Sequence, residues 1–126
     1  MREGAMMPLE HFQSCMAACR ACAAACEHCA ASCLREEDVR TMVRCIRLDL
    51  DCEQACLVAA SLMARHSPFS KDFCRLCAEV CDACAEECAQ HAMEHCQRCA
   101  QACRDCAQAC RHMIAQDAAA TSVGGA

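Results

Sequence analysis

The sequence predicts an all-α fold, an antiparallel up-down four-helix bundle with its cysteines facing the core. The chain has 126 residues, which suits one domain with a single core. It contains only three glycines and two prolines and has no tryptophan or tyrosine, so signals for turns and strands are sparse. Of its 19 cysteines, 16 recur at alternating steps of three and four residues in three stretches. That spacing is typical of a helix face that points into a bundle.

Three stretches keep this alternating pattern throughout, and we expect one helix through each. The first cysteine stripe is Cys15, Cys19, Cys22, Cys26, Cys29 and Cys33. The second is Cys74, Cys77, Cys81, Cys84 and Cys88, and the third is Cys96, Cys99, Cys103, Cys106 and Cys110.

The stretch between the first two stripes predicts a different kind of helix. Its inward stripe combines Cys45, Cys52 and Cys56 with other residues in the same phase, namely Met42, Asp49, Ala59, Met63 and His66. A second apolar stripe runs beside it and contains Val39, Val43, Ile46, Leu50 and Leu57. Two adjacent apolar faces favour a contact outside the bundle, and we interpret the second as a subunit interface. Extra packing against the first or third helix is the alternative.

Breaker and capping residues place the helix boundaries. We expect the second helix to begin around residues 36–38, where acidic side chains favour a helix N-terminus. Ser67 suits a cap, with Pro68 at the first position of the third helix. Residues 90–94 join the third and fourth helices. Residues 1–116 then form a single metal-binding domain, and residues 117–126 form a flexible C-terminal tail.

Charge and composition exclude several classes of protein. The net charge is −5 and no basic stripe is present, so a nucleic-acid partner is not expected. No segment reaches the roughly 18 apolar residues of a membrane span, and no leader-like run precedes the first helix. We therefore expect a cytoplasmic protein. No catalytic constellation appears, and CxxC recurs in mid-helix instead of once after a strand, so the chain is not expected to be an enzyme.

The cysteine spacing argues against a disulfide scaffold, the usual interpretation of so many cysteines. The count is odd. Residues three or four apart on a helix have Cβ atoms about 5–6 Å apart, whereas a disulfide needs about 3.5–4.5 Å. A metal ion held between two such sulfurs bridges the gap without distortion.

Copper(I) is the metal that this array favours. Cu(I) selects soft thiolate ligands and accepts two or three of them, whereas zinc and iron–sulfur clusters need four converging ligands. Neutral thiols can each exchange one proton for one Cu⁺ without changing the charge of the core. The sequence therefore predicts about one Cu(I) per cysteine. Zinc or another soft metal is the alternative.

A few further side chains at the cysteine stripes are candidate metal ligands. Imidazole and thioether groups bind copper(I), and carboxylates bind metals more generally. These candidates are His91, His95, Met63, Met113, Met42, Asp49 and Asp51. For Met63 and Met113 we favour simple core filling. For Asp49 we favour pairing with an arginine.

Two segments resemble the bacterial copper storage proteins, in particular their cytosolic branch. They are RCIRLDLDCEQAC (Arg44–Cys56) and LCAEVCDACAEECAQHAMEHCQRCAQAC (Leu76–Cys103), and the resemblance covers roughly residues 8–113. It implies a four-helix bundle that binds many Cu(I) ions and assembles as a tetramer. It also implies histidines at the junction of the third and fourth helices, where His91 and His95 match. The exported branch carries a signal sequence that this chain lacks.

The role of the bound copper stays open at this point. Storage for copper enzymes and detoxifying sequestration both suit a high capacity. A copper metallochaperone, which exchanges copper with donor and acceptor proteins, typically offers one exposed CxxC. The number of cysteines favours storage.

Overall fold

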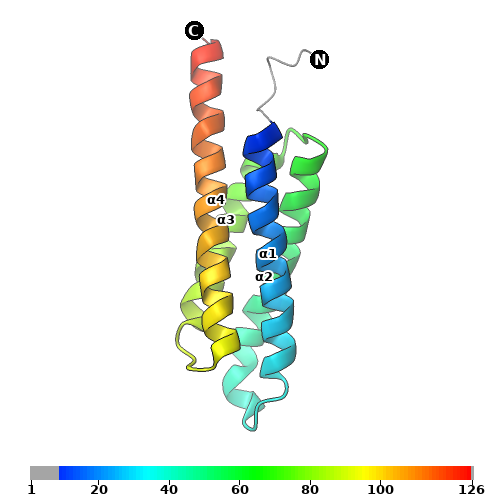
Figure 1. Ribbon diagram of the computed structural model, residues 1–126, viewed down its shortest axis with the longest axis vertical. Coiled ribbons are helices and arrows are strands. Elements are labelled where there is room, and N and C mark those ends of the chain that lie inside the picture. Colours follow the sequence, from blue (N-terminus) through cyan, green and yellow to red (C-terminus); the bar gives the residue numbers. More distant parts are fainter. Residues whose placement is uncertain (1–8, 126) are drawn as a thin grey trace.

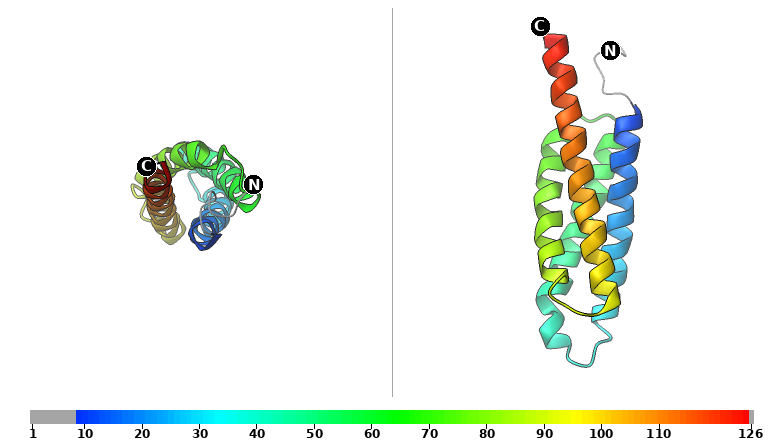
Figure 2. Two further views of the ribbon diagram at one scale, coloured as in Figure 1. Left: turned by 90° about the horizontal axis from the view of Figure 1, so that it is seen from above. Right: turned by 60° about the vertical axis from the view of Figure 1, so that its left-hand side comes forward.

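Four antiparallel α-helices and one short 3₁₀ helix make up the computed structural model, which describes residues 9–125 and, for side chains, residues 12–116. The elements follow in the order α1 (Leu9–Cys33), η2 (Val39–Met42), α2 (Val43–Ala64), α3 (Ser70–Cys88) and α4 (Glu94–Gly125). The helices run up and down around a common axis (Figures 1 and 2). The predicted fold class is confirmed.

Each helix packs against two neighbours. The adjacent pairs are α1 with α2, α2 with α3, α3 with α4 and α4 with α1. The turn from α1 to η2 and the turn from α3 to α4 lie at one end of the bundle, at the bottom of Figure 1. The turn from α2 to α3 lies at the other end, beside the start of α1. We call the end that holds the α1–η2 and α3–α4 turns the lower end. The candidate histidines His91 and His95 lie there.

Among the described residues the core consists almost entirely of cysteine, alanine and methionine, with Phe12 as its one aromatic side chain. All 19 cysteines are buried, and Met42, Met63 and Asp49 are completely enclosed. The helices can approach closely because sulfur and methyl groups are small. The bulk that leucine and phenylalanine normally supply is therefore replaced by a column of thiols.

Two helix starts differ from the sequence prediction. The α-helical part of α2 begins at Val43, because η2 comes first: the carbonyl of Asp38 accepts hydrogen bonds from the amide and the hydroxyl of Thr41. The third helix begins at Ser70 instead of Pro68. The N-cap residue of α3 is Phe69 and not Ser67, although the Ser67 hydroxyl accepts a hydrogen bond from the Phe69 amide at 3.1 Å in the preceding turn.

The last helix is longer than expected. The sequence placed a flexible tail from residue 117, whereas α4 continues as a helix to Gly125. The flexibility of this segment stays a prediction, and residue 126 lies outside the described part of the chain. The division at residue 116 also stays a prediction.

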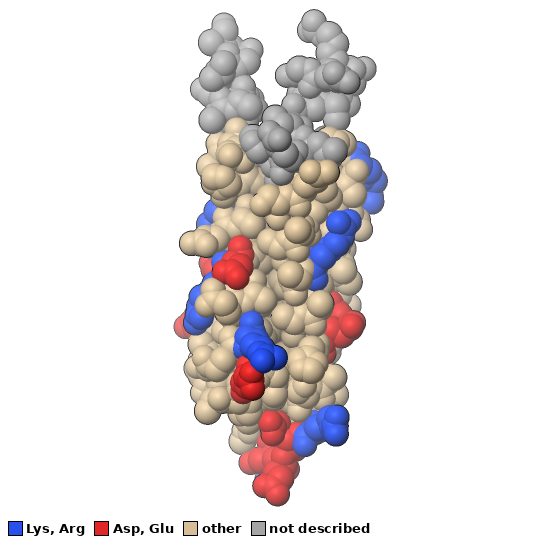
Figure 3. All heavy atoms as spheres, in the orientation of Figure 1, with Lys and Arg blue, Asp and Glu red and all other residues tan. Residues whose placement is uncertain are grey.

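The surface carries mixed charge. Acidic and basic side chains alternate over the face seen in Figure 3, and acidic atoms gather near the lower end, where the α1–η2 turn lies. In the described part of the chain no helix is long and apolar enough to cross a membrane.

Candidate metal centre

The thiols form a continuous column along the bundle axis. All 19 are free, and neighbouring Sγ atoms lie between 3.5 and 4.0 Å apart, for example 3.5 Å for Cys52 with Cys81 and 4.0 Å for Cys22 with Cys26. An S–S bond is about 2.05 Å long. The thiols are thus close together but form no disulfide bonds, as expected from the helical steps.

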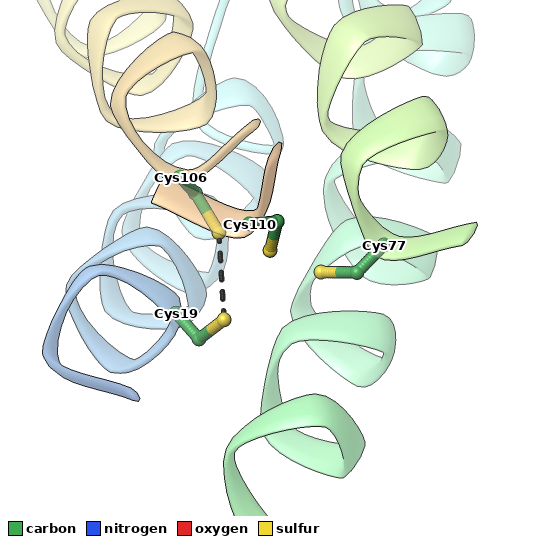
Figure 4. A group of neighbouring side chains, drawn as sticks. All are labelled: Cys19, Cys77, Cys106 and Cys110. Atoms are coloured by element: carbon green, nitrogen blue, oxygen red, sulfur yellow. Dashed lines mark hydrogen bonds between the residues drawn. The ribbon is translucent and has the colours of Figure 1, made fainter. Parts of the chain in front are cut away.

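Sulfurs from different helices converge into groups of four. In each group the ligand atoms all lie within 4.8 Å of one another. Four of these groups share no cysteine: Cys19, Cys77, Cys106 and Cys110; Cys22, Cys52, Cys56 and Cys81; Cys26, Cys84, Cys99 and Cys103; and Cys29, Cys33, Cys45 and Cys96. Figure 4 shows the first group, in which Cys106 donates to Cys19 at 3.6 Å.

A fifth group connects two of these four, the second and the third. Cys22, Cys26, Cys52 and Cys103 also lie within reach of one another, so the middle of the column is shared between neighbouring sites. An ion entering one group is therefore a short step from the next. The arrangement can hold several soft cations in contact with common sulfurs.

Burial favours the protonated thiol at two lower-end positions of the empty protein, Cys33 and Cys96. Removal from water raises the pKa of Cys96 to about 11 and also raises the pKa of Cys33. A thiolate at these positions needs a cation beside it. Metal binding must therefore release protons.

Asp49 reaches the middle of the array from α2. Its Oδ1 atom accepts hydrogen bonds from Cys84 at 3.2 Å and from Cys88 and Cys99 at 3.3 Å, and its Oδ2 atom lies 3.8 Å from Cys45. Burial, followed by the nearby Cys99 and Cys45, raises the pKa of Asp49 to about 8.

The predicted arginine partner of Asp49 is wrong, because thiols make all four of the hydrogen bonds described for its carboxyl group. The sequence showed that Asp49 lies on the cysteine stripe. It gave no signal for the cross-helix thiols that surround the side chain. Asp51, the other candidate carboxylate, is exposed to solvent and lies away from the thiols.

The two candidate histidines have different surroundings. The Nδ1 atom of His95 lies 3.5 Å from the sulfurs of Cys29 and Cys96 and 4.0 Å from that of Cys33. The Nε2 atom of His91 lies 2.8 Å from Glu87, and no thiol is among the contacts described for this ring. The structure therefore brings His95, and not His91, to the array.

The candidate methionines are buried at both ends of the column. Met42 and Met63 are fully enclosed, and Met113 is almost so. All three belong to the same core cluster as the cysteines. Core filling accounts for this burial, and a role as metal ligands stays a prediction.

Comparison with known proteins assigns the family. The model of the copper storage proteins matches residues 9–115, nearly the whole described chain. The chain belongs to the copper storage protein family. All 19 cysteines of this copper storage protein, from Cys15 to Cys110, lie within the matched segment.

Solved structures of similar proteins agree with this assignment. The Cu(I)-bound copper storage protein BsCsp3 is 44% identical, with a TM-score of 0.80 over 82% of this chain and 98% of that one. A cytosolic copper storage protein from Streptomyces lividans, solved with five coppers, is 41% identical, with a TM-score of 0.82 over 85% of this chain and 94% of that one.

A cysteine-rich protein of Bacillus subtilis (strain 168), YhjQ, described as uncharacterized, is also similar. It is 44% identical over 71 residues, which cover 56% of this chain and 66% of that protein. The match thus spans just under two thirds of that relative's length.

Proposed function

We propose that this copper storage protein holds about one Cu(I) ion per core cysteine and keeps the ions away from solvent. The observation that carries the proposal is the column of 19 buried, unbonded thiols with sulfurs 3.5–4.0 Å apart. The two solved relatives that were described with bound copper support it.

Charge balance favours Cu(I) over zinc in this column. A zinc ion with four thiolates carries a net charge of −2, so four separate Cys₄ sites would leave a large negative charge in a dry core. One Cu⁺ for each thiolate leaves the core neutral. The four groups that share no cysteine also limit zinc to about four ions, whereas copper can use every sulfur.

Storage suits the burial better than copper transfer does. A metallochaperone needs a thiol pair that a partner protein can reach, and here all 19 cysteines are buried. Copper storage and copper detoxification make the same demands on the fold. Deleting the gene separates them: copper sensitivity supports protection, and loss of cuproenzyme activity after copper withdrawal supports supply. We propose no catalytic role.

An anaerobic Cu(I) titration against a competing chelator tests the proposal, with the bound copper counted by native mass spectrometry. We expect a plateau near 19 ions per chain and about one proton released per ion, because each Cu⁺ replaces one thiol proton. A plateau at four or five ions, with zinc bound more tightly than copper, would overturn it.

We also propose that two of the other candidate ligands, His95 and Asp49, bind copper together with the thiols. The contacts of His95 and Asp49 with thiols support this role. The similar protein from S. lividans, which is described as cytosolic, supports a cytoplasmic location. For Met42, Met63 and Met113 we propose core packing. We propose no ligand role for His91 or Asp51.

The outer face of α2 supports a homotetramer. Val43, Leu50 and Leu57 are 45%, 46% and 48% exposed and lie seven residues apart, so they follow one line along the helix. Val39 and Ile46 are half-buried beside them. Large exposed aliphatic groups in a row are typical of a protein interface.

A further inference from the structure

We propose that Glu36 is the positioning residue for His95: its carboxylate holds one ring nitrogen so that the other faces the thiols and is free to bind Cu(I). The inference rests on the proposed copper storage and names a residue outside the thiol array. It follows from the position of Glu36, the different contacts of the two ring nitrogens of His95, and the distances between the sulfurs.

Glu36 is fixed at the lower end by its backbone. It lies in the turn between α1 and η2, and its amide donates to the carbonyl of Cys33 at 3.2 Å. The side chain is 31% exposed and its Oε1 atom lies 3.3 Å from Nε2 of His95, which is only 15% exposed. The carboxylate thus closes the solvent side of the ring.

This contact determines which nitrogen of neutral His95 carries the proton. A carboxylate accepts hydrogen bonds but cannot donate them. Nε2 must therefore carry the proton that it donates to Glu36, and Nδ1 keeps its lone pair. Nδ1 is the atom that faces Cys29 and Cys96. Carboxylate–histidine–metal arrangements orient ligands in this way in many metal sites.

The spacing of the three ligand atoms already suits a metal ion. A trigonal site with metal–sulfur bonds of about 2.3 Å and a metal–nitrogen bond of about 2.0 Å spans about 4.0 Å between sulfurs and about 3.7 Å between nitrogen and sulfur. The observed separations are 3.8 Å for Cys29 with Cys96, and 3.5 Å from Nδ1 to each sulfur. Little movement is needed if the ring is held in place.

His91 provides a comparison, because this ring also contacts a glutamate but no thiol among its described contacts. Its Nε2 atom lies 2.8 Å from Oε2 of Glu87. The other oxygen of Glu87 accepts a hydrogen bond from Nε of Arg44 at 3.1 Å. This network ties α2 to the end of α3 and leaves His91 away from the sulfurs. A histidine–glutamate contact alone therefore does not make a copper ligand, whereas Glu36 acts on a ring that already touches three cysteines.

The test compares Glu36→Ala with Glu37→Ala, a substitution of the neighbouring exposed residue. Nitrogen NMR of ¹⁵N-histidine-labelled apo protein reads the tautomer of His95 directly, and circular dichroism checks the fold. We expect the native protein and Glu37→Ala to carry the proton on Nε2, and Glu36→Ala to show a mixture. A proton on Nδ1 in the native protein, or an unchanged tautomer in Glu36→Ala, overturns the proposal.

A second measurement follows the His95 Nδ1 resonance while a chelator buffer sets free Cu(I). We expect half-occupancy of His95 to need about tenfold more free Cu(I) in Glu36→Ala, the lower end of the loss seen for such supporting residues. An equal shift in Glu37→Ala, or a shift below twofold in Glu36→Ala, contradicts the role.

The two proposals can fail separately. The apo tautomer needs no copper, and the capacity near 19 ions tests storage in the native protein whatever the state of His95. A full capacity with an unaffected tautomer removes only the role of Glu36. A low capacity with the expected tautomer removes the storage function.

Discussion

Single residues in the core are constrained by the cost of burying charge. The carboxyl group of Asp49 is fully buried among thiols, and burial raises its pKa to about 8 from an ordinary value near 3.8. Near neutral pH it is therefore largely protonated in the empty protein.

Replacing Asp49 by asparagine should change how the stability of the apo protein depends on pH. Because the folded pKa is above the unfolded one, the folded state binds an extra proton between about pH 4 and 8, and stability is lost as the pH rises through this window. We expect the native protein to lose up to about 1.4 kcal/mol of unfolding free energy per pH unit from this group. Asp49→Asn should lack that slope.

Anaerobic urea unfolding of the apo protein at pH 5.5, 6.5 and 7.5 measures the effect. Asp51→Asn is the matched control, because Asp51 lies two residues away and is exposed. Parallel pH slopes for the native protein and Asp49→Asn would contradict a buried, protonated carboxyl.

At the scale of single helices, α2 ends with a backbone conformation that its local sequence does not favour. His66 follows α2 with a φ of 52°, in the left-handed region that usually requires glycine. Its amide donates to Met63, and the amide of Ser67 donates to Leu62 at 2.9 Å, which together form a Schellman motif. The ring meets Phe12 edge-on with 5.3 Å between the ring centroids, and its buried Nδ1 atom has no hydrogen-bond partner among the described residues.

We expect His66→Gly to stabilise the apo protein. Glycine removes a left-handed strain of about 1–2 kcal/mol and an unpaired buried nitrogen, while the lost ring contact with Phe12 costs about 0.5–1.5 kcal/mol. The net gain should be about 0.5–1 kcal/mol in the free energy of unfolding, measured with denaturant.

The control for this substitution is Ala83→Gly in the exposed middle of α3, which should destabilise by about 1 kcal/mol. Destabilisation by both glycines would show that the histidine ring contributes more than its backbone costs.

At the scale of the whole molecule, the outer face of α2 exposes the apolar side chains of Val43, Leu50 and Leu57, which no other described part of the chain covers. We expect Leu50→Glu to dissociate the proposed tetramer, because a carboxylate placed in an apolar interface loses its hydration. Sedimentation or native mass spectrometry measures the change.

Leu34→Glu is the control, since Leu34 is even more exposed, at 60%, but lies in the α1–η2 turn. It should leave the assembly intact. A native protein that is monomeric at micromolar concentration would contradict the interface. The copper capacity should be the same in both variants, because each column lies within one chain.

The periodicity of the cysteines by itself determined the fold class, the inward stripes and the metal-binding chemistry. This was possible because a helix repeats every 3.6 residues, so spacing along the chain fixes which side chains share a face. It correctly placed Met42, Asp49 and Met63 beside the cysteines, and the 90–94 junction between helices.

Only the tertiary structure decided which side chains meet across the bundle. His91 and His95 looked equivalent in the sequence, yet one ring faces Glu87 and the other faces three thiols. The thiol partners of Asp49 and the contact of Glu36 with His95 could not be predicted for the same reason. Contacts between helices depend on their relative register and on the turns that join them, and neither leaves a periodic trace in the sequence.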